Sequence, residues 1–482
     1  MGINRKLILE NILLAVILIF SFSLRLYRID NPVADWHSFR QADTSAVSRN
    51  FLRYGVDLLH PKFDDLSNIP SGKDNPEGYR FVEFPIYNLF QAITAKSFPQ
   101  KSLEWWGRMI SIIFSLGSII FLYLIVKKYF GWVTGLLAAI FFGILPFSIY
   151  YSRVILPEPM MLFASLGMIY FFINWIEKEK FLYYFLSLVF AATSLLLKPF
   201  SAFLFLPLGY LVLRKWGMGS LRKISAYLFF LLAVTPFFLW RIWMSQYPEG
   251  IPAFVWLLNE GGIRFKGAFF RWIFEERLGK LILGSWGIIP LALGLIIKPN
   301  KKEGWFFHFW VLAILIYFSV IAAGNVQHDY YQIMAIPIIC IFLAKGAYFF
   351  LFESGTLFSR YLSNLLFVVC FLFMIAFSWY EVRGFFNVNH WEIVEAGTAA
   401  NKILPPSAKV VAPYEGDTAF LYQINRRGWA AVTNSIESLL SHGATAYVSV
   451  NLSDKLTQDL AKQYKILETG KNYIIIDLTH KK

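Results

Sequence analysis

The chain of 482 residues is 57% hydrophobic and 19% aromatic, and only 16% of its residues are charged. Its mean hydropathy of +0.52 exceeds what a soluble domain carries, so a soluble globular protein is excluded. The net charge of +14 is spread over many short basic loops, which excludes a nucleic-acid-binding patch as its cause.

A helix needs about 20 mostly apolar residues to cross the hydrocarbon core of a bilayer. The hydropathy pattern predicts about eleven such helices, and therefore an α-helical polytopic membrane protein. They are expected near residues 7–24, 107–126, 131–150, 157–175, 181–197, 200–213, 224–243, 281–297, 305–323, 333–352 and 362–380. The first is expected to be a retained helix and not a cleaved signal peptide, because Arg25-Leu26-Tyr27-Arg28 follows it in place of a small-residue cleavage site.

Lysine and arginine in the short loops predict the topology, because such loops stay cytoplasmic. The turns on the side of the N-terminus are basic, as at Lys127-Lys128 and Arg214-Lys215. We therefore expect a cytoplasmic N-terminus, an extracytoplasmic C-terminus and a location in the inner (plasma) membrane of a bacterium. The outer face carries the long segments, at residues 25–106, residues 241–280 and the last hundred or so, so function is expected there.

The first long segment, residues 25–106, opens with a predicted helix. Ser38-Phe39-Arg40-Gln41 matches a capping box, in which Ser38 caps the helix and Gln41 bonds back to its start. The helix is expected to end near Tyr54, before Gly55, and to lie along the membrane surface with Asp43 near the interface. Residues 57–79 are expected to be irregular, and a second, aromatic-rich helix is expected from Phe84.

The composition changes after about Asn389, where short helices and strands alternate. Strands are predicted at residues 409–412, 446–450 and 473–476, and helices near 391–403, 417–424, 435–442 and 453–463. This pattern predicts a membrane domain at residues 1–380 and a small extracytoplasmic α/β domain at residues 381–482. No sequence repeat relates two halves of the membrane region, which argues against inverted-repeat transporter folds.

Three further outer turns carry charge at the level of the membrane. Arg153 and Glu158 lie at the entrance of the fourth span, Lys198 lies between the fifth and sixth, and His328 precedes Tyr330-Tyr331 before the tenth. A charge at the centre of a span costs on the order of 2.5–3.5 kcal/mol, so these side chains either reach to the surface or line a wet cavity. The cationic and tyrosine side chains could hold a lipid phosphate.

Two carboxylates flank the predicted capping box, and each has two possible roles. Asp35 and Asp43, like Glu158, could abstract a proton. Alternatively, Asp35 only favours the positive end of the helix dipole, and Asp43 only pairs with Arg40 or Arg49 on a solvated face.

In their order and shared sidedness, these residues resemble the GT-C glycosyltransferases. The resemblance is to the bacterial protein-O-mannosyltransferase-like group, which includes the aminoarabinose transferases acting on lipid A. It is carried by residues 36–44 ahead of Arg49-Asn50-Phe51, by residues 153–158, by Lys198-Pro199, and by residues 328–331 followed by Pro337. Many relatives have an Asp-Glu pair in the first outer loop. Here the aligned pair is Arg40-Gln41, so the base stays open between Asp43 and Asp35.

The resemblance implies a GT-C architecture and the transfer of a hexosyl or pentosyl group from a polyprenyl-phosphate donor to an acceptor hydroxyl, with inversion. It implies Asp43 as the base with Asp35 in reserve. The phosphate-binding side chains would be Arg153, Lys198, Tyr331, Arg40 and His328, and Glu158 and Tyr330 would contact the sugar or the acceptor. No metal or other cofactor is expected, although two carboxylates and a histidine could bind a divalent metal. The partners would be the donor lipid and a glycan, lipid or protein acceptor.

Three alternative functions stay open. A transporter or flippase of lipid-linked sugars would use the same cations without a base. A transferase that uses a diphosphate-linked oligosaccharide would require a divalent metal at the leaving group. An acceptor-binding or assembly protein would use residues 414–417 and 426–429 of the C-terminal part, although these are also typical turn residues.

Overall fold

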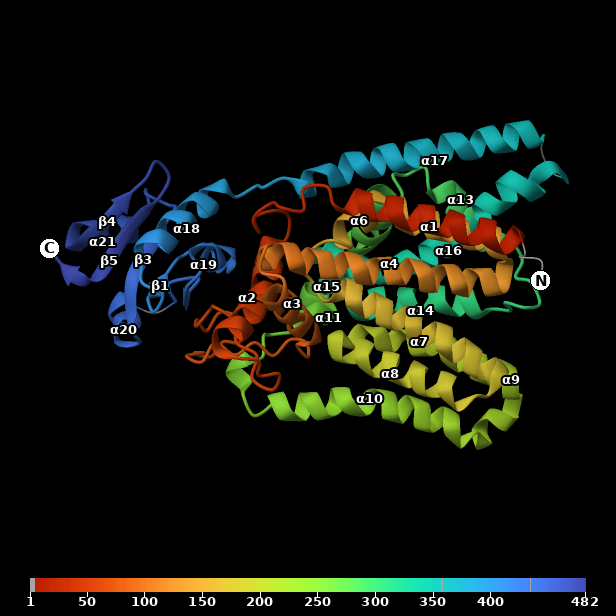
Figure 1. Ribbon diagram of the computed structural model, residues 1–482, viewed down its shortest axis with the longest axis horizontal. Coiled ribbons are helices and arrows are strands. Elements are labelled where there is room, and N and C mark those ends of the chain that lie inside the picture. Colours follow the sequence, from red (N-terminus) through yellow and green to blue (C-terminus); the bar gives the residue numbers. More distant parts are fainter. Residues whose placement is uncertain (1–4, 357–358, 434) are drawn as a thin grey trace.

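The computed structural model describes residues 5–356, 359–433 and 435–482. A bundle of long helices forms one end and most of the molecule, and a small sheet forms the other end (Figure 1). α2 (Ser38–Tyr54) and α3 (Ile86–Ser97) lie between them. The predicted fold class, a helical membrane protein with a small C-terminal α/β part, is confirmed.

Every predicted span coincides with helical structure in the bundle. The bundle consists of α1 (Arg5–Arg25), α4 (Leu103–Phe130), α5 (Trp132–Ile144), α6 (Pro146–Tyr151), α7 (Glu158–Lys178), α8 (Phe181–Leu197), α9 (Phe205–Trp216), α10 (Ile224–Met244), α13 (Ile288–Ile296), α14 (Phe306–Val320), α15 (Ala322–Gln327), α16 (Ile336–Tyr348) and α17 (Arg360–Val382). Within the described residues, six helical segments are long and apolar enough to cross a membrane, and three shorter apolar helices accompany them. The protein is therefore a multi-pass membrane protein, and the number of eleven spans stays a prediction.

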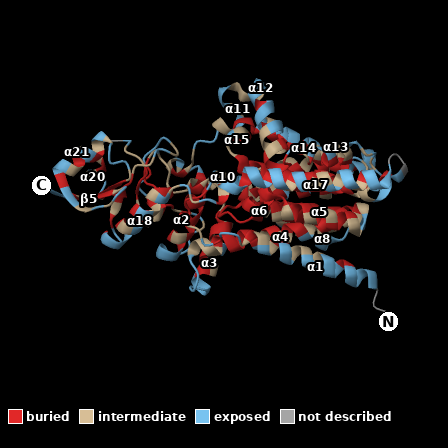
Figure 2. Ribbon diagram, turned by 90° about the horizontal axis from the view of Figure 1, so that it is seen from above, coloured by how far each residue is buried: buried red, intermediate tan, exposed pale blue. Residues whose placement is uncertain are grey.

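The outer helices expose apolar side chains. In Figure 2 the outward faces of α1 and α17 are largely exposed, while buried residues fill the inside of the bundle. The exposed side chains include Ile12, Val16 and Ile19 of α1 and Leu365 and Leu372 of α17. Such a surface is stable in hydrocarbon, where helices satisfy their own backbone hydrogen bonds.

One break in the bundle has a clear cause. α5 ends at Ile144 because Leu145 precedes Pro146, which disfavours the helical conformation of the residue before it, and Pro146 then opens α6. The fully buried Arg25 donates hydrogen bonds to the carbonyl oxygens of Gly143 (2.8 Å) and Phe142 (3.3 Å) near this break. A charged side chain of α1 thereby satisfies backbone groups that the interrupted helix leaves open.

The predicted capping box at the start of α2 is wrong. The N-cap residue is His37, in a left-handed conformation (φ 55°), and no side chain caps the helix. Gln41 does not bond back to the helix start, because its amide donates to Asp35 (2.7 Å) and accepts from the backbone N–H of Ile155 (3.2 Å). The predicted end is confirmed, since Tyr54 is the last helical residue and Gly55 follows with φ 94°. Most of α2 is buried, between α3, α4 and the C-terminal part.

The C-terminal part is a five-stranded mixed sheet with short helices. Its elements are α18 (Trp391–Ile403), β1 (Lys409–Val411), α19 (Ala419–Ile424), β2 (Arg427–Trp429), α20 (Ile436–Ser441), β3 (Ala444–Ser449), α21 (Lys455–Gln463), β4 (Tyr464–Thr469) and β5 (Ile474–Lys481). The strand order is β2-β1-β3-β5-β4; β2, β1 and β3 are parallel, and β5 is antiparallel to both β3 and β4. The sequence pattern predicted three of the strands and all four helices, but not β2 or β4.

The C-terminal part is docked on the 25–106 segment. Gly428 of β2 donates to the backbone oxygen of Asp64 (2.9 Å) and accepts from Leu66 (2.7 Å), so that the segment covers the edge of the sheet. On α2, Arg49 donates to the backbone oxygen of Tyr422 (3.0 Å), and the Tyr422 hydroxyl donates to Ser45 (2.9 Å). The two parts of the chain therefore form one continuous structure around α2.

Candidate active site

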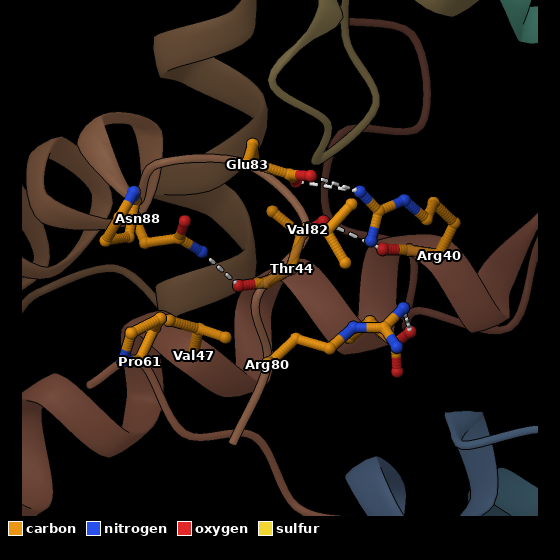
Figure 3. Close-up of a pocket in the computed structure, with 10 residues that line it drawn as sticks. Arg40, Thr44, Val47, Pro61, Arg80, Val82, Glu83 and Asn88 are labelled. Carbon is orange, nitrogen blue, oxygen red and sulfur yellow. Dashed lines mark hydrogen bonds and ion pairs between the residues drawn. The ribbon is translucent and has the colours of Figure 1, made fainter. Parts of the chain in front are cut away.

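A small pocket lies between α2 and the chain that leads into α3 (Figure 3). Its free space of about 10 Å³ is roughly that of one water molecule. The lining residues are Arg40, Asp43, Thr44, Val47, Pro61, Arg80, Val82, Glu83, Pro85 and Asn88. The charged side chains among them come from two segments that lie about forty residues apart in the sequence.

Asp43 is buried in this pocket, and both of its carboxylate oxygens have partners. Arg80 donates to Oδ2 at 2.5 Å, and the hydroxyl of Thr418 donates to Oδ1 at 2.6 Å. The alternative that Asp43 pairs with Arg40 or Arg49 on a solvated face is therefore wrong. A hydroxyl group from the C-terminal part contacts the carboxylate that the sequence analysis favoured as a base.

Arg40 and Glu83 face each other across the pocket (Figure 3). Nη2 of Arg40 donates to both carboxylate oxygens of Glu83, at 2.7 and 2.8 Å. Lys198 continues this chain of charges, because its Nζ lies 3.0 Å from Glu158 and 3.9 Å from Glu83. The structure thus brings together Arg40, Lys198 and Glu158, which the sequence analysis proposed, and adds Glu83 to them.

The charges in this chain stabilise one another. Burial raises the pKa of Glu83, but Arg40, Lys198 and Arg80 lower it, and the net pKa is below its ordinary value. Burial lowers the pKa of Lys198, but Glu158 and Glu83 raise it, and the net pKa is above its ordinary value. Both groups are therefore charged at neutral pH. With the pair of Arg80 and Asp43 included, the site holds three cations and three carboxylates, so its charges cancel. An incoming phosphate therefore has to replace a carboxylate as the partner of Arg40 or Lys198.

Arg80 and Glu83 are the site residues that the sequence analysis missed. They lie just after the stretch predicted to be irregular, where no motif marks them. The one available indication was a cation and a carboxylate three residues apart immediately before an aromatic helix. Their pairing with Asp43 and Arg40 depends on the fold and not on local spacing.

Tyr330, Tyr331 and His328 form an aromatic cluster beside these charges. The rings of Tyr330 and Tyr331 lie 4.5 Å apart, and His328 stacks on Tyr330 at 5.4 Å. Tyr330 lies near Arg40, and Tyr331 lies near Lys198. Burial lowers the pKa of His328 to about 4, so the imidazole is neutral at pH 7 and offers hydrogen bonds but no positive charge.

Asp35 and Arg153 lie in a second buried cluster. Asp35 accepts from Gln41 at 2.7 Å and lies 3.8 Å from Arg108. Arg153 donates to the backbone oxygen of Arg28 at 2.9 Å, and among the described residues it has no contact with Lys198 or Tyr331. Burial raises the pKa of Asp35 above its ordinary value although Arg108 and Arg153 oppose this. The fold therefore places Arg153 with Asp35 and Arg108, and not with Lys198 as the sequence predicted.

Asp329, next to His328, fixes the start of α2 in place. It is fully buried and accepts from His37 (2.7 Å), Trp36 (3.0 Å) and Tyr151. Arg277 lies 3.5 Å away. Within the described chain, no group of three or more His, Cys, Asp or Glu side chains is arranged to hold a metal ion.

Comparisons with known proteins agree with this architecture. Residues 82–243 match the model of the family described as dolichyl-phosphate-mannose-protein mannosyltransferase, a range that includes Glu83, Glu158 and Lys198. No curated protein matches the chain in sequence.

Solved structures match over nearly the whole chain. ArnT from Cupriavidus metallidurans, in its apo state, has a TM-score of 0.67 at 13% identity, with 98% of each chain covered. The same protein bound to undecaprenyl phosphate has a TM-score of 0.65 at 13% identity and 98% coverage of each chain. The oligosaccharyltransferase AglB from Archaeoglobus fulgidus, in complex with an inhibitory peptide and a dolichol-phosphate, has a TM-score of 0.54 at 10% identity, covering 97% of this chain and 74% of its own.

The chain is a multi-pass membrane protein with the fold of the GT-C glycosyltransferases. Within that fold, it is similar to ArnT and to the protein-mannosyltransferase family, as the sequence resemblance predicted.

Proposed function

We propose that the protein is a membrane glycosyltransferase that moves a hexosyl or pentosyl group from a polyprenyl-phosphate donor to an acceptor hydroxyl. One observation carries the proposal: a hydroxyl group, that of Thr418, donates a hydrogen bond to the buried carboxylate of Asp43, in a pocket that Arg40 also lines. The Arg40 partner in that pocket, Glu83, lies 3.9 Å from Lys198. The family match and the structural similarity to ArnT and AglB support a lipid-linked donor.

In this proposal, Asp43 is the general base. The acceptor hydroxyl takes the place of Thr418 on Oδ1, while Arg80 holds Oδ2 and keeps the carboxylate oriented. The acceptor oxygen forms a bond to the anomeric carbon, the bond from that carbon to the phosphate oxygen breaks, and the hydroxyl proton goes to Asp43. A single displacement of this kind inverts the configuration of the anomeric carbon.

The polyprenyl phosphate gains a second negative charge as it leaves. Lys198 and Arg40 would stabilise this charge, because each can exchange a carboxylate partner for a phosphate oxygen. Tyr331 would add a hydrogen bond, with His328 in support as a neutral donor. Glu83, released from Arg40, would join Glu158 and Tyr330 around the sugar or acceptor. Arg153 has no part in this step, and no metal or cofactor is proposed.

The proposal includes the placement of the chain in the membrane. Residues 1–380 would form the transferase domain of an inner-membrane protein with a cytoplasmic N-terminus, and residues 381–482 would form an extracytoplasmic domain. The basic turns on the N-terminal side support this orientation. The reaction would then take place at the extracytoplasmic face.

The direct test is transfer of labelled sugar from polyprenyl-phosphate donors by the purified protein in liposomes, with a chelator present. Asp43→Asn should lower kcat by a factor of about 10² to 10⁴, the contribution typical of a general base. Asp35→Asn tests the rival base, and Asp30→Asn, at an exposed position, is the control. Full activity of Asp43→Asn would transfer the role to Asp35 or Glu158. If labelled lipid crosses the bilayer without being consumed, the protein is a flippase and the proposed transferase function is wrong.

A further inference from the structure

A second, larger cavity lies in the C-terminal part. Its volume is about 770 Å³, within the roughly 300–1,000 Å³ typical of sites for small molecules. Its walls come from the residues that directly follow β1, β2 and β3, together with His390 before α18 and Asp454 before α21. The pocket at Asp43 is far too small for a sugar, so this cavity is the better candidate for holding a bulky substrate.

The position of the cavity in the sheet is that of a ligand site. The three strands are parallel, so their carboxyl ends meet at one edge. The chain runs from β1 outward to β2 and then crosses back to β3 on the other side of β1, so the connections leave the β1 and β3 ends in opposite directions. A crevice opens at such a switch point, and ligands of α/β sheets bind in it.

The lining identifies the chemistry of the ligand. Glu415, Asp417 and Asp454 contribute carboxylates, and no lysine or arginine is among the described residues that line the cavity. The side chain of Asp454 caps α21 by accepting from Thr457 (3.2 Å), so this helix end is not available for an anion. Phosphate and other anions are therefore disfavoured.

Uncharged polyhydroxylated ligands fit the same lining. Carboxylates accept hydrogen bonds from pairs of hydroxyl groups, and Tyr414 adds an aromatic side chain whose hydroxyl is held by His390 and Glu392, each at 2.7 Å. An amino group on the ligand would also be favoured by three carboxylates. The chemistry is that of a neutral or amino-bearing sugar.

One residue of the cavity wall is the sequence neighbour of a residue that contacts Asp43. Asp417 in its wall precedes Thr418, whose hydroxyl contacts Asp43 at 2.6 Å. Besides burial, the charge of Asp43 contributes to a raised pKa of Asp417, about 6. Short α19, which begins after Thr418, lies between the sheet and α2 (Figure 1). The cavity therefore borders the segment that carries Thr418, and a ligand bound there lies on the C-terminal side of the Asp43 contact.

We propose that this cavity is the acceptor site and binds a neutral or amino-bearing sugar unit of a glycan, whose free hydroxyl then replaces Thr418 on Asp43. The inference rests on the proposed function, because it names the acceptor class of that reaction. The acceptor would be a glycan or glycolipid, and an unglycosylated peptide would not be recognised here.

The first test measures binding without any donor, by saturation-transfer NMR on the full chain in nanodiscs. The probes are mannobiose, chitobiose, glucose 1-phosphate and a serine- and threonine-rich peptide. We expect at least one disaccharide to bind in a way that Val432→Trp weakens, and no binding of glucose 1-phosphate that Val432→Trp changes. Val432→Trp fills the cavity and should weaken binding at least tenfold. The matched control is Thr398→Trp, in a separate surface hollow beside α18.

Each other result overturns the inference. Failure of both disaccharides to bind, preference for the peptide, or binding that Val432→Trp does not change would show that the cavity is not a sugar site. In the liposome assay, Val432→Trp should raise KM for the acceptor at least tenfold with a smaller effect on kcat, and an unchanged KM would refute the acceptor role. If a disaccharide binds in the cavity but no donor is consumed, the sugar site stands, and the proposed transferase and the acceptor role both fail.

Discussion

Thr418 offers the most direct perturbation of the site, because its hydroxyl occupies one oxygen of Asp43. Thr418→Val removes this hydrogen bond at nearly constant side-chain volume. A hydrogen bond to a charged group contributes about 1.5–3 kcal/mol. An acceptor that must displace Thr418 from Oδ1 therefore binds more weakly by up to that amount, which corresponds to roughly 10- to 150-fold in affinity. We expect Thr418→Val to lower KM for the acceptor within this range.

The docking of the C-terminal part should survive the substitution. Arg49, Tyr422 and the backbone of Gly428 hold it to the 25–106 segment independently of Thr418. The assay is transfer in liposomes at varied acceptor concentration, with Thr398→Val, at an exposed helix position, as the control. A fall in kcat with an unchanged KM would refute the reasoning. In that case Thr418 orients Asp43 and does not stand in for the acceptor.

The remaining predictions concern charge. In the wild type, Nη2 of Arg40 donates to both carboxylate oxygens of Glu83, and the ammonium group of a lysine cannot reproduce this geometry. Arg40→Lys should therefore lower kcat/KM for the donor about 10- to 100-fold. Equal activity of the variant would show that the pairing is dispensable. Asp329→Ala leaves the donors His37 and Trp36 without their buried acceptor and should lower the free energy of unfolding by about 3–5 kcal/mol. This loss should appear as a lower Tm in detergent, and an unchanged Tm would contradict the anchoring role of Asp329. Burial raises the pKa of Asp65 from 3.8 to about 6, so folding favours its protonated form; that stabilisation is complete below pH 4 and is lost as pH rises through 6. The free energy of unfolding of the wild type, relative to that of Asp65→Asn, should therefore fall by about 3 kcal/mol between pH 4 and pH 7.5. A difference in unfolding free energy that stays constant with pH would contradict this.

Sequence patterns predicted the features that depend on local composition. Apolar runs located helical structure at every expected span, because hydrocarbon selects directly for apolar side chains. The pattern of short, largely apolar stretches located β1, β3 and β5. It failed for β2, where Gly428 interrupts the apolar pattern; the glycine is required because a Cβ would collide with the backbone oxygen of Val410.

The features that depend on distant partners were not predictable in this way. The capping box at Ser38 was consistent with local chemistry, but Gln41 gains a buried carboxylate, Asp35, and a backbone N–H in the turn before α7, and these outcompete the helix start. Glu83 was missed because its partner, Arg40, lies 43 residues away. Asp43 was proposed from its place in the loop, and its role stays a prediction, now with Arg80 and Thr418 as its partners.

The contact between Asp43 and Thr418 joins positions 375 residues apart, and this separation sets an order of events during biosynthesis. At about 5–20 residues per second, a ribosome needs roughly 20 to 75 seconds to reach Thr418 after Asp43 has left it. During that interval the membrane helices can insert, while the backbone groups of Asp64 and Leu66 that later pair with Gly428 of β2 have no β2 partner. The carboxylate therefore obtains its full set of partners only in a nearly finished chain, and in a nascent or truncated polypeptide already in the bilayer Oδ1 of Asp43 lacks the Thr418 hydroxyl.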